Sequence, residues 1–287
     1  MSAPTDPRLL KSNGRTAHIS LKGLVDAQTF VEGETRQITV QTAALLKSPM
    51  GPRERELITG ERFQVLAVQG RFSFGFALKD GYVGYVFNDV LERMEEVTHR
   101  VSAPRSFRKD TADIKAWEPV SYLSYGAQVF VIDMDETWAR VAFPHLDEFV
   151  EQVVPARHLT PLDITASDPV AEAKKLLGTP YLWGGNSSFG IDCSGLVQAA
   201  WGACGLSLPG DSDLQANAGI EIEGQLHPGD LIFWNGHVAM VSSEDEIIHA
   251  NAHHMAVTLE NLTQATARIK AAQGGDITAR RRVAPLA

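Results

Sequence analysis

Residues 178–205 read GTPYLWGGNSSFGIDCSGLVQAAWGACG, a glycine-rich loop that runs into a mostly apolar segment. From Cys193 onward this segment has small and apolar residues on most faces, which is typical of a buried helix. Cys193 therefore stands at a predicted helix start, where free backbone N–H groups and the positive end of the helix dipole favour a thiolate. The pattern predicts a nucleophilic cysteine. Cys204 falls inside the same predicted helix and is interpreted as a small buried apolar residue.

The flanking segments predict an α+β fold. Before the glycine-rich loop, DPVAEAKKLLG at 168–178 has helical spacing, with Ser167 or Asp168 as the cap and Gly178 as the stop. Helix followed by a meander of antiparallel strands is an α+β architecture. The four strand-like segments lie at 230–234, 237–243, 246–251 and 255–259.

Two histidines in the strand-like segments are candidate partners of the cysteine. A cysteine nucleophile needs a base that is near in space, and His237 opens the apolar segment HVAMV directly after an Asn-Gly turn. His249 lies in the next segment, IIHAN. With a hairpin turn at 243–245, the start of the first strand lies beside the end of the second, so the two histidines become neighbours. The second imidazole can then orient the first, as the third member of a catalytic triad does.

The first 163 residues have a different texture. Residues 37–94 and 97–162 each contain short period-2 stretches separated by turn formers, and the two blocks share an order of elements. This pattern indicates two small SH3-like barrels, with a single larger β-domain as the alternative. The domains that we expect are an N-terminal arm at 1–35 with a short helix at 24–31, a first barrel at 36–95, a second barrel at 96–163 and a catalytic domain at 164–287.

The composition argues against several kinds of partner and site. The chain has 287 residues, 44% of them hydrophobic, and a formal net charge of −9, which does not suit nucleic acid or an anionic membrane surface. Two cysteines are too few for a disulfide framework. No apolar run approaches the roughly 20 residues that span a bilayer, and the first twenty residues do not read as a secretory signal. We therefore expect a cytoplasmic protein.

No metal or other cofactor is expected. The chain contains neither an HExxH nor a CxxC motif, so a zinc site has no sequence support. The adjacent pair His253-His254 is interpreted as an exposed turn rather than as a ligand pair.

The carboxy-terminal part of the sequence resembles the NlpC/P60 cysteine peptidases, which share a papain-like α+β core. The resemblance covers most of residues 168–260. It implies a Cys193 nucleophile, a His237 general base and a His249 that orients the base. It also implies a Tyr181 hydroxyl that faces the site. The matching motifs, in the expected order, are Pro180-Tyr181-x-Trp183-Gly184-Gly185, Asp192-Cys193-Ser194-Gly195, Pro228-Gly229-Asp230-Leu231, Gly236-His237-Val238 and His249-Ala250.

The wider chain resembles a subgroup of that family, the γ-D-glutamyl-L-diamino-acid endopeptidases, which carry two SH3-like domains ahead of the catalytic domain. The resemblance implies a murein peptide substrate with a free L-Ala-γ-D-Glu end and cleavage after the D-Glu. The released dipeptide begins with meso-diaminopimelate or L-Lys, and the sequence leaves both open. Asp211 and Ser212 stand where the subgroup carries an Asp-Ser pair that contacts the substrate.

Residues next to the nucleophile are further candidates for substrate binding, namely Asp192, Ser194 and Trp183. The subgroup often has an arginine beside its Asp-Ser pair, whereas this chain reads LPGDS at 208–212. Ser194 and the loop backbone are therefore alternative donors to the γ-D-Glu carboxylate.

The first barrel is expected to close the substrate end. By the same resemblance, the acidic stretch RERELITGE and the strand DGYVGYV supply the groups. Carboxylates can pair the substrate ammonium, and an aromatic wall can block a longer peptide. Glu56 and Tyr82 are the first choices for these roles, with Asp211 as a second carboxylate. Glu54 and Tyr85 are the alternatives.

Three functions are compatible with these residues. The first is a cytoplasmic peptidase that recycles murein peptides. The second is an amidase or acyltransferase that uses the same Cys-His pair on another acyl group. The third is a binding module with a vestigial catalytic core. The intact set of one cysteine and two histidines argues against the third function, and the Asp-Ser pair with the preceding barrels favours the first.

Overall fold

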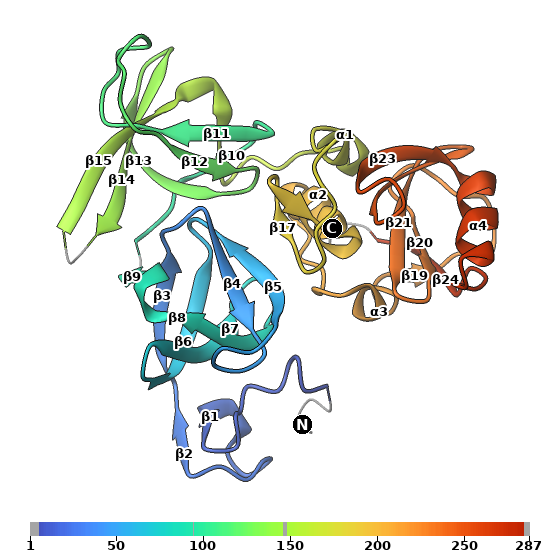
Figure 1. Ribbon diagram of the computed structural model, residues 1–287, viewed down its shortest axis with the longest axis horizontal. Coiled ribbons are helices and arrows are strands. Elements are labelled where there is room, and N and C mark those ends of the chain that lie inside the picture. The colour runs from blue at the N-terminus through green and yellow to red at the C-terminus, as the bar shows by residue number, and fades with distance from the viewer. Residues whose placement is uncertain (1–5, 94, 146–147, 284–287) are drawn as a thin grey trace. The chain divides into compact units, whose positions relative to one another are not determined.

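The structure is a computed structural model that describes residues 6–93, 95–145 and 148–283 (Figure 1). It divides into two compact units, Met1–Leu162 and Asp163–Ala287, which we call unit 1 and unit 2. Unit 1 runs from blue to light green in Figure 1, and unit 2 runs from yellow to red. Each unit is described by itself.

The first large sheet of unit 1 has seven strands in the order β5-β4-β8-β7-β6-β3-β9, and every neighbouring pair is antiparallel. Fully or almost fully buried side chains of Ile38, Leu45, Phe63 and Val86 build its core. The strands are Glu34–Ile38 (β3), Thr42–Leu46 (β4), Arg53–Ile58 (β5), Arg62–Gln69 (β6), Phe72–Ala77 (β7), Val83–Phe87 (β8) and Leu91–Arg93 (β9), with a 3-10 turn at Asn88–Val90.

The second sheet of unit 1 has five strands in the order β15-β14-β13-β10-β16 and a core of its own, which includes Val101, Leu123, Val129 and Val154. Because both sheets lie in one compact unit, the division into two domains near residue 95 stays a prediction. The strands are His99–Val101 (β10), Gln128–Met134 (β13), Trp138–His145 (β14), Glu148–Pro155 (β15) and Leu159–Pro161 (β16), with a 3-10 turn at Ala156–His158 and a separate ribbon of Arg105–Arg108 (β11) and Ser121–Ser124 (β12).

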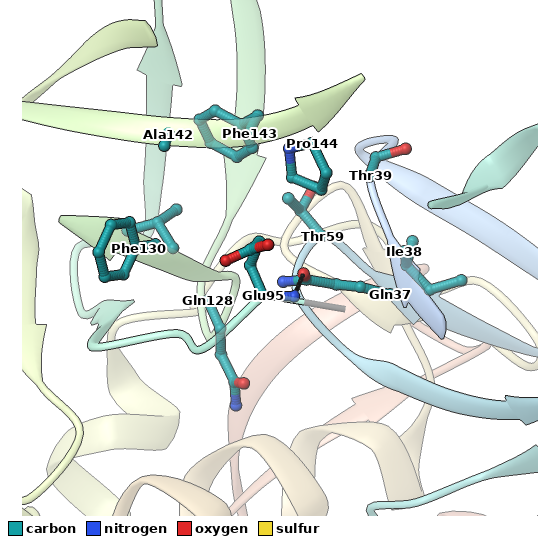
Figure 2. A pocket seen from close by; sticks show the side chains of 11 residues that line it. Gln37, Ile38, Thr39, Thr59, Glu95, Gln128, Phe130, Ala142, Phe143 and Pro144 are labelled. Atoms are coloured by element: carbon teal, nitrogen blue, oxygen red, sulfur yellow. Dashed lines mark hydrogen bonds between the residues drawn. The ribbon is translucent and has the colours of Figure 1, made fainter. Parts of the chain in front are cut away.

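The two sheets of unit 1 meet at a small cavity with room for about one water molecule (Figure 2). The backbone N–H of Gln128 donates to the Thr59 carbonyl at 2.9 Å across this junction. A Cβ on Gly60, whose φ is +88°, would lie 2.2 Å from the Gln128 carbonyl oxygen, so a glycine is required there. The cavity is a packing gap and is too small for an organic ligand.

The N-terminal arm contains strands where a helix is predicted. Thr16–His18 (β1) pairs in parallel with Thr29–Val31 (β2), and a 3-10 turn spans Ile19–Leu21. The prediction of a short helix at 24–31 is therefore wrong. The backbone N–H groups of Gln28 and Thr29 both donate to the Arg15 carbonyl rather than along a helix.

Unit 2 packs helices on both sides of a six-stranded antiparallel sheet of order β19-β24-β20-β21-β22-β23 (Figure 1). The helix α4 packs Ala265 and Ile269 onto one side, while α1 and α2 contact β21 and β22 from the other. The helices are Pro169–Lys174 (α1), Cys193–Ala203 (α2), Ser212–Gln215 (α3) and Leu262–Ala271 (α4). The strands are Ile220–Glu221 (β19), Leu231–Trp234 (β20), His237–Ser243 (β21), Glu246–Asn251 (β22), Ala256–Asn261 (β23) and Ala279–Arg282 (β24).

The α+β prediction for unit 2 is confirmed, and several of its boundaries are too. β21 and β22 span the residues predicted for them, α1 begins after Asp168, and α2 begins at Cys193. Cys204 is a correction, because it is the residue after the last helical position of α2 rather than a residue inside it. The helix α4 and the strand β24, which inserts between β19 and β20, are not predicted by the sequence patterns.

Candidate active site

Cys193 is the first residue of α2, and Asp192 caps that helix. One carboxylate oxygen of Asp192 accepts from the Gly195 N–H at 2.7 Å and from the Ser194 hydroxyl at 2.9 Å. The other oxygen accepts from the Gly184 N–H at 3.0 Å. Such a cap satisfies N–H groups that a helix start leaves without partners. Asp192 thus ties the nucleophile's helix to the glycine-rich loop.

The glycine-rich loop lies too close to the first turn of α2 for side chains at the contact. The loop folds back as a short hairpin of Asn186–Ser187 (β17) and Gly190–Ile191 (β18). A Cβ on Gly195 would lie 2.7 Å from the Gly185 carbonyl oxygen. The glycines are therefore required by packing, and they fix the backbone on both sides of the thiol.

The two predicted histidines are joined by a hydrogen bond. His237 begins β21 and His249 lies in β22, and their Nε2 and Nδ1 atoms are 2.9 Å apart. Their ring centroids are 5.1 Å apart at an angle of 59°. His249 is completely buried. The prediction that a hairpin brings these two side chains together is confirmed.

Cys193 lies against the start of β21. The backbone N–H of Val238 hydrogen-bonds to the Cys193 sulfur, which places the sulfur beside the residue that follows His237. Since Nε2 of His237 is used by His249, Nδ1 is the nitrogen left for the thiol. The cysteine and the two histidines thus form one connected site within unit 2.

A carboxylate and a guanidinium extend this site beyond the predicted residues. Nε2 of His249 lies 3.0 Å from Oε2 of Glu260 in β23. Arg268 in α4 donates to both oxygens of Glu260, from Nε at 2.9 Å and from the guanidinium NH2 nitrogen at 2.6 Å. Sequence reasoning missed Glu260 and Arg268, because no motif marks them. The only available signal is the alternation of β23, which pairs His249 with Thr258, two residues from Glu260.

Burial keeps the reacting groups neutral. It raises the pKa of the Cys193 thiol to about 12, although the N–H groups of Val238 and Ser194 act in the opposite direction. Burial also lowers the pKa of His237 to about 3 and the pKa of His249 to about 4. The N–H groups at the helix start favour the thiolate, as the sequence predicts, but desolvation outweighs them. Both the Cys193 thiol and the His237 imidazole are therefore neutral at pH 7.

Tyr181 and Trp183 border the nucleophile on the glycine-rich loop. Burial, followed by the charges of Cys193 and Asp192, raises the pKa of Tyr181 to about 12. The hydroxyl therefore remains a hydrogen-bond donor at neutral pH. The Trp183 side chain is 69% exposed, so it offers an aromatic surface beside the site.

Asp211 and Ser212 are attached to the nucleophile's helix through Gln215. They form the start of α3, with Asp211 at its cap position. Gln215 is fully buried, and its Nε2 donates to the carbonyls of Ser194 at 3.0 Å and Pro209 at 2.9 Å. Gln215 is a third residue that the sequence patterns missed. The Ser194 hydroxyl, which was the alternative donor to the substrate carboxylate, donates its hydrogen bond to Asp192.

Glu56 and Tyr82 lie in unit 1, and both are more buried than a loop position implies. Glu56 is a strand residue of β5 that is 7% exposed and pairs with Arg53 at 2.9 Å. Tyr82 is 3% exposed and belongs to the core of the first sheet. Of the alternatives, Glu54 lies in the same strand, and the Tyr85 ring packs on Phe74. Their part in substrate binding stays a proposal.

Two further findings concern only the residues that the structure describes. Within 6–93, 95–145 and 148–283, no group of three or more His, Cys, Asp and Glu side chains is arranged to hold a metal ion. Across the same three segments, every helix is too short or too polar to cross a membrane. His253 and His254 lie in an exposed turn, as the sequence predicts.

Comparison with known proteins matches two families. Residues 178–273 match the NlpC/P60 family, and residues 45–91 match the bacterial dipeptidyl-peptidase Sh3 domain. A γ-D-glutamyl-L-lysine dipeptidyl-peptidase of Bacillus subtilis is 27% identical over 233 residues, which are 74% of this chain and 76% of that protein. One of the same name from Bacillus cereus is 36% identical over 94 residues, or 30% of this chain and only 28% of that protein.

A solved structure shares the fold. An NlpC/P60 family protein from Bacillus cereus superposes with a TM-score of 0.76 at 20% identity, over 88% of this chain and 100% of that one. Among curated relatives, a probable endopeptidase p60 of Listeria grayi is 39% identical over 98 residues, yet this chain spans only 19% of its length. The match to the NlpC/P60 family model, residues 178–273, includes Cys193 and the two histidines.

Proposed function

Because the chain carries an NlpC/P60 domain behind a bacterial SH3 domain, we propose that this cysteine peptidase hydrolyses the bond between γ-D-glutamate and the diamino acid of murein peptides. The observation that carries the proposal is the linked set of Cys193, His237 and His249 in unit 2. The similarity to a γ-D-glutamyl-L-lysine dipeptidyl-peptidase over three quarters of both chains supports the choice of substrate.

In the first half of the reaction the Cys193 sulfur attacks the γ-carbonyl carbon of the D-glutamate. The thiol proton passes to Nδ1 of His237, while Nε2–H of that ring stays bonded to His249. The oxygen that becomes negative accepts from the backbone N–H of Cys193 and from the Tyr181 hydroxyl. Transfer during the attack is required because burial keeps both the thiol and the imidazole neutral beforehand.

In the second half the His237 imidazolium gives its proton to the amine of the diamino acid, and the C–N bond breaks. The γ-D-glutamyl group remains on Cys193 as a thioester. His237, neutral again, takes a proton from a water molecule that attacks the thioester. His237 returns that proton to the departing sulfur, which frees the L-Ala-γ-D-Glu product and restores the Cys193 thiol.

Recognition of the free peptide end belongs to the same proposal. An ammonium group pairs well with carboxylates, and Asp211 lies on the segment that Gln215 ties to the nucleophile's helix. Ser212 and Trp183 flank the peptide in this proposal, and Asp192 with Ser194 supports them from the helix cap. By the family resemblance, Glu56 and Tyr82 of unit 1 are candidates for binding the amino-terminal end of the peptide. We therefore expect Glu56→Gln to raise the KM of the free peptide.

The deciding experiment compares two substrates. Purified protein is incubated with L-Ala-γ-D-Glu-meso-diaminopimelate and with the same peptide acetylated at its amino terminus, and products are identified by mass. Cleavage of the free peptide alone supports the proposal, whereas equal cleavage of both contradicts recognition of the amine. A parallel peptide with L-Lys measures the preference for the diamino acid.

The alternative chemistry is tested in the same reaction. If an added amine captures the γ-D-glutamyl group in preference to water, the enzyme is an acyltransferase rather than a peptidase. We also propose that the activity serves murein peptide recycling in the cytoplasm. Cell fractionation with an antibody to the chain tests that location.

A further inference from the structure

We propose that Glu260 is a positioning residue that fixes the tautomers of both active-site histidines, and that Arg268 fixes the orientation of Glu260. The inference deepens the proposed function and rests on its assignment of Cys193 and His237. Its central claim concerns the resting protein, so it can be tested without any substrate.

The argument begins with an uninterrupted series of hydrogen bonds. Arg268 binds both oxygens of Glu260, and Oε2 of Glu260 lies 3.0 Å from Nε2 of His249. Nδ1 of His249 lies 2.9 Å from Nε2 of His237. Three elements that follow one another in the chain, β22, β23 and α4, supply His249, Glu260 and Arg268. The series ends at the histidine that faces the thiol.

Chemistry assigns a direction to each bond. Arginine has only donors, so both oxygens of Glu260 act as acceptors toward it. An ionised carboxylate also accepts from His249, which places the proton of that neutral ring on Nε2 and leaves Nδ1 as an acceptor. His237 must then donate from Nε2, and its Nδ1 is left unprotonated. That is the tautomer a base needs in order to accept the Cys193 proton.

The surroundings of Glu260 support the ionised state. Hydrogen bonds from Arg268 hold the pKa of the Glu260 carboxyl below its ordinary value, against the effect of burial. The Glu260 side chain is 12% exposed and that of Arg268 is 24% exposed, so water competes only weakly for these bonds. The pair therefore remains a fixed acceptor for His249 across the neutral range.

Replacing the carboxylate by an amide gives a specific expectation. In Glu260→Gln, the donors of Arg268 bind the oxygen of the new amide. The guanidinium has no acceptor for the amide NH2 group. The amide NH2 group then faces Nε2 of His249 and moves the proton of that ring to Nδ1. His249 in turn donates to Nε2 of His237, which transfers the proton of His237 to Nδ1. The base is left protonated on the nitrogen that faces the thiol.

The kinetic result follows from this reversal. An amide in place of the orienting carboxylate of a serine protease triad lowers kcat by about 10⁴ through the wrong tautomer. Because Glu260 is one residue further from the base, we expect kcat of Glu260→Gln to fall on the order of 10²-fold, with little change in KM.

A double variant separates positioning from simple stabilisation. In Glu260→Gln with Arg268→Met, nothing holds the amide oxygen on the far side, so it can turn toward His249 and accept from Nε2. We expect the double variant to recover activity relative to Glu260→Gln alone, although it has lost one more side chain. A purely structural role predicts further loss instead.

Nuclear magnetic resonance reads the tautomers directly. In protein labelled with ¹⁵N-histidine, the wild type should carry its protons on Nε2 of both His237 and His249 at pH 7. Glu260→Gln should carry them on Nδ1. Signals are assigned by their loss in His237→Asn and His249→Asn. Unchanged tautomers in Glu260→Gln would overturn the inference, whatever happens to activity.

Alkylation of Cys193 by iodoacetamide supplies a reactivity readout that needs no peptide. Peptide mapping distinguishes Cys193 from Cys204, and the pH profile between 5 and 10 should show slower reaction in Glu260→Gln and partial recovery in the double variant. Identical profiles in all three proteins would contradict the inference. The charged and titratable groups around the histidines that bear on this profile are Tyr181, Asp192, Cys193, His254, Glu260 and Arg268.

Matched controls come from the strand next to that of Glu260 and from the helix that carries Arg268. Glu246 of β22 accepts a hydrogen bond from Ser242 at 2.6 Å but is not part of the series, and Lys270 of α4 pairs with the exposed Asp276. Glu246→Gln and Lys270→Met should leave tautomers and kcat unchanged. Failure of every protein to cleave the murein peptide, with the tautomer shift intact, would reject the proposed substrate and leave the positioning inference standing.

Discussion

The two cysteines of the chain lie at opposite ends of α2. Both are buried, but their surroundings differ. Cys193 stands at the amino-terminal end, where the N–H of Val238 meets its sulfur. Cys204 stands at the carboxy-terminal end, where Gly205 and Leu206 close the helix by bonding back to Gly202 and Trp201. As whole residues, Cys193 and Cys204 are 7% and 5% exposed, so exposure does not distinguish them.

The comparison teaches that position on a helix is necessary but not sufficient for reactivity. The carboxy-terminal end of a helix disfavours a negative sulfur, whereas the amino-terminal end favours it. Burial nevertheless keeps Cys193 protonated, so its chemistry depends on His237 and on the bonds that fix that ring. In the proposed mechanism, Cys193 differs from Cys204 because another strand, β21, supplies it with His237 as a base.

The largest expected difference between the two ends is in catalysis. Cys193→Ala should lower kcat by about 10⁴-fold or more, since loss of a nucleophile removes the covalent route. Cys204→Ala should retain the wild-type kcat. Both are measured on L-Ala-γ-D-Glu-meso-diaminopimelate. Full activity of Cys193→Ala would reject the assignment of the nucleophile.

The next effect tests the donor beside the amino-terminal end. Tyr181→Phe removes a hydroxyl that the burial of the ring keeps protonated, and kcat should fall by about 10²–10³-fold. Tyr122→Phe, at an exposed position of β12, is the control and should have no effect. An unchanged kcat in Tyr181→Phe would remove that hydroxyl from the oxyanion site.

Acid should destabilise the region around the amino-terminal end. His249 is buried as the neutral ring with a pKa lowered to about 4, and the unfolded chain takes up the proton near 6.5. Above pH 6.5 protonation of His249 therefore costs the folded state nothing. As the pH falls toward 4, the free energy of unfolding decreases by up to about 1.4 kcal/mol per pH unit. His237 adds a loss of the same sign, because its pKa is also lowered.

Denaturant unfolding between pH 7 and 4.5 measures this dependence. His249→Asn should flatten the slope of the unfolding free energy against pH, whereas His253→Gln, in the exposed turn, should leave it unchanged. Equal slopes in wild type and His249→Asn would show that the buried ring is not the source.

A smaller effect is expected at Asp192, which caps the end of α2 that carries Cys193. Asp192→Ala should cost about 0.5–2 kcal/mol of stability, and so should Asp168→Ala, which removes the cap of α1. Only Asp192→Ala should also slow alkylation of Cys193, because it releases Gly184, Ser194 and the loop that borders the thiol. Equal alkylation rates in the two variants would mean that the cap does not position the sulfur.

The smallest expected effect is at the carboxy-terminal end. Cys204→Ala removes one buried sulfur and should cost about 0.5–1.5 kcal/mol, as the loss of a buried methyl-sized group does. Native Cys204 should resist iodoacetamide under conditions that modify Cys193. A Cys204 that reacts first would reverse the comparison.

Much of the catalytic unit could be predicted because its signals are local. The β21 and β22 segments are short apolar runs bounded by turn formers, and the start of α2 follows an aspartate cap. A helix was wrongly predicted in the N-terminal arm because the backbone N–H groups of Gln28 and Thr29 donate to the Arg15 carbonyl rather than to residues one helical turn earlier. When a three-residue strand pairs with another strand elsewhere in the chain, it is too short to show an alternating pattern of apolar residues.

The remote parts of the site could not be predicted, for a related reason. Gln215 and Arg268 are ordinary polar residues in sequence, and only the packing of α3 on α2 and of α4 on the sheet gives them buried partners. The burial of Tyr82 in the core of the first sheet likewise depends on how seven strands close around it. The partners of these residues come from segments that lie apart in the sequence.

The sequence by itself determined which cysteine stands at a helix start, which two histidines share a hairpin and which family those motifs resemble. Local spacing and turn residues are sufficient for each of these conclusions. Only the tertiary structure decided that burial keeps Cys193 and His237 neutral and that Glu260 and Arg268 stand behind His249. Desolvation and hydrogen-bond direction arise from the surroundings that packing creates, and therefore no stretch of sequence contains them.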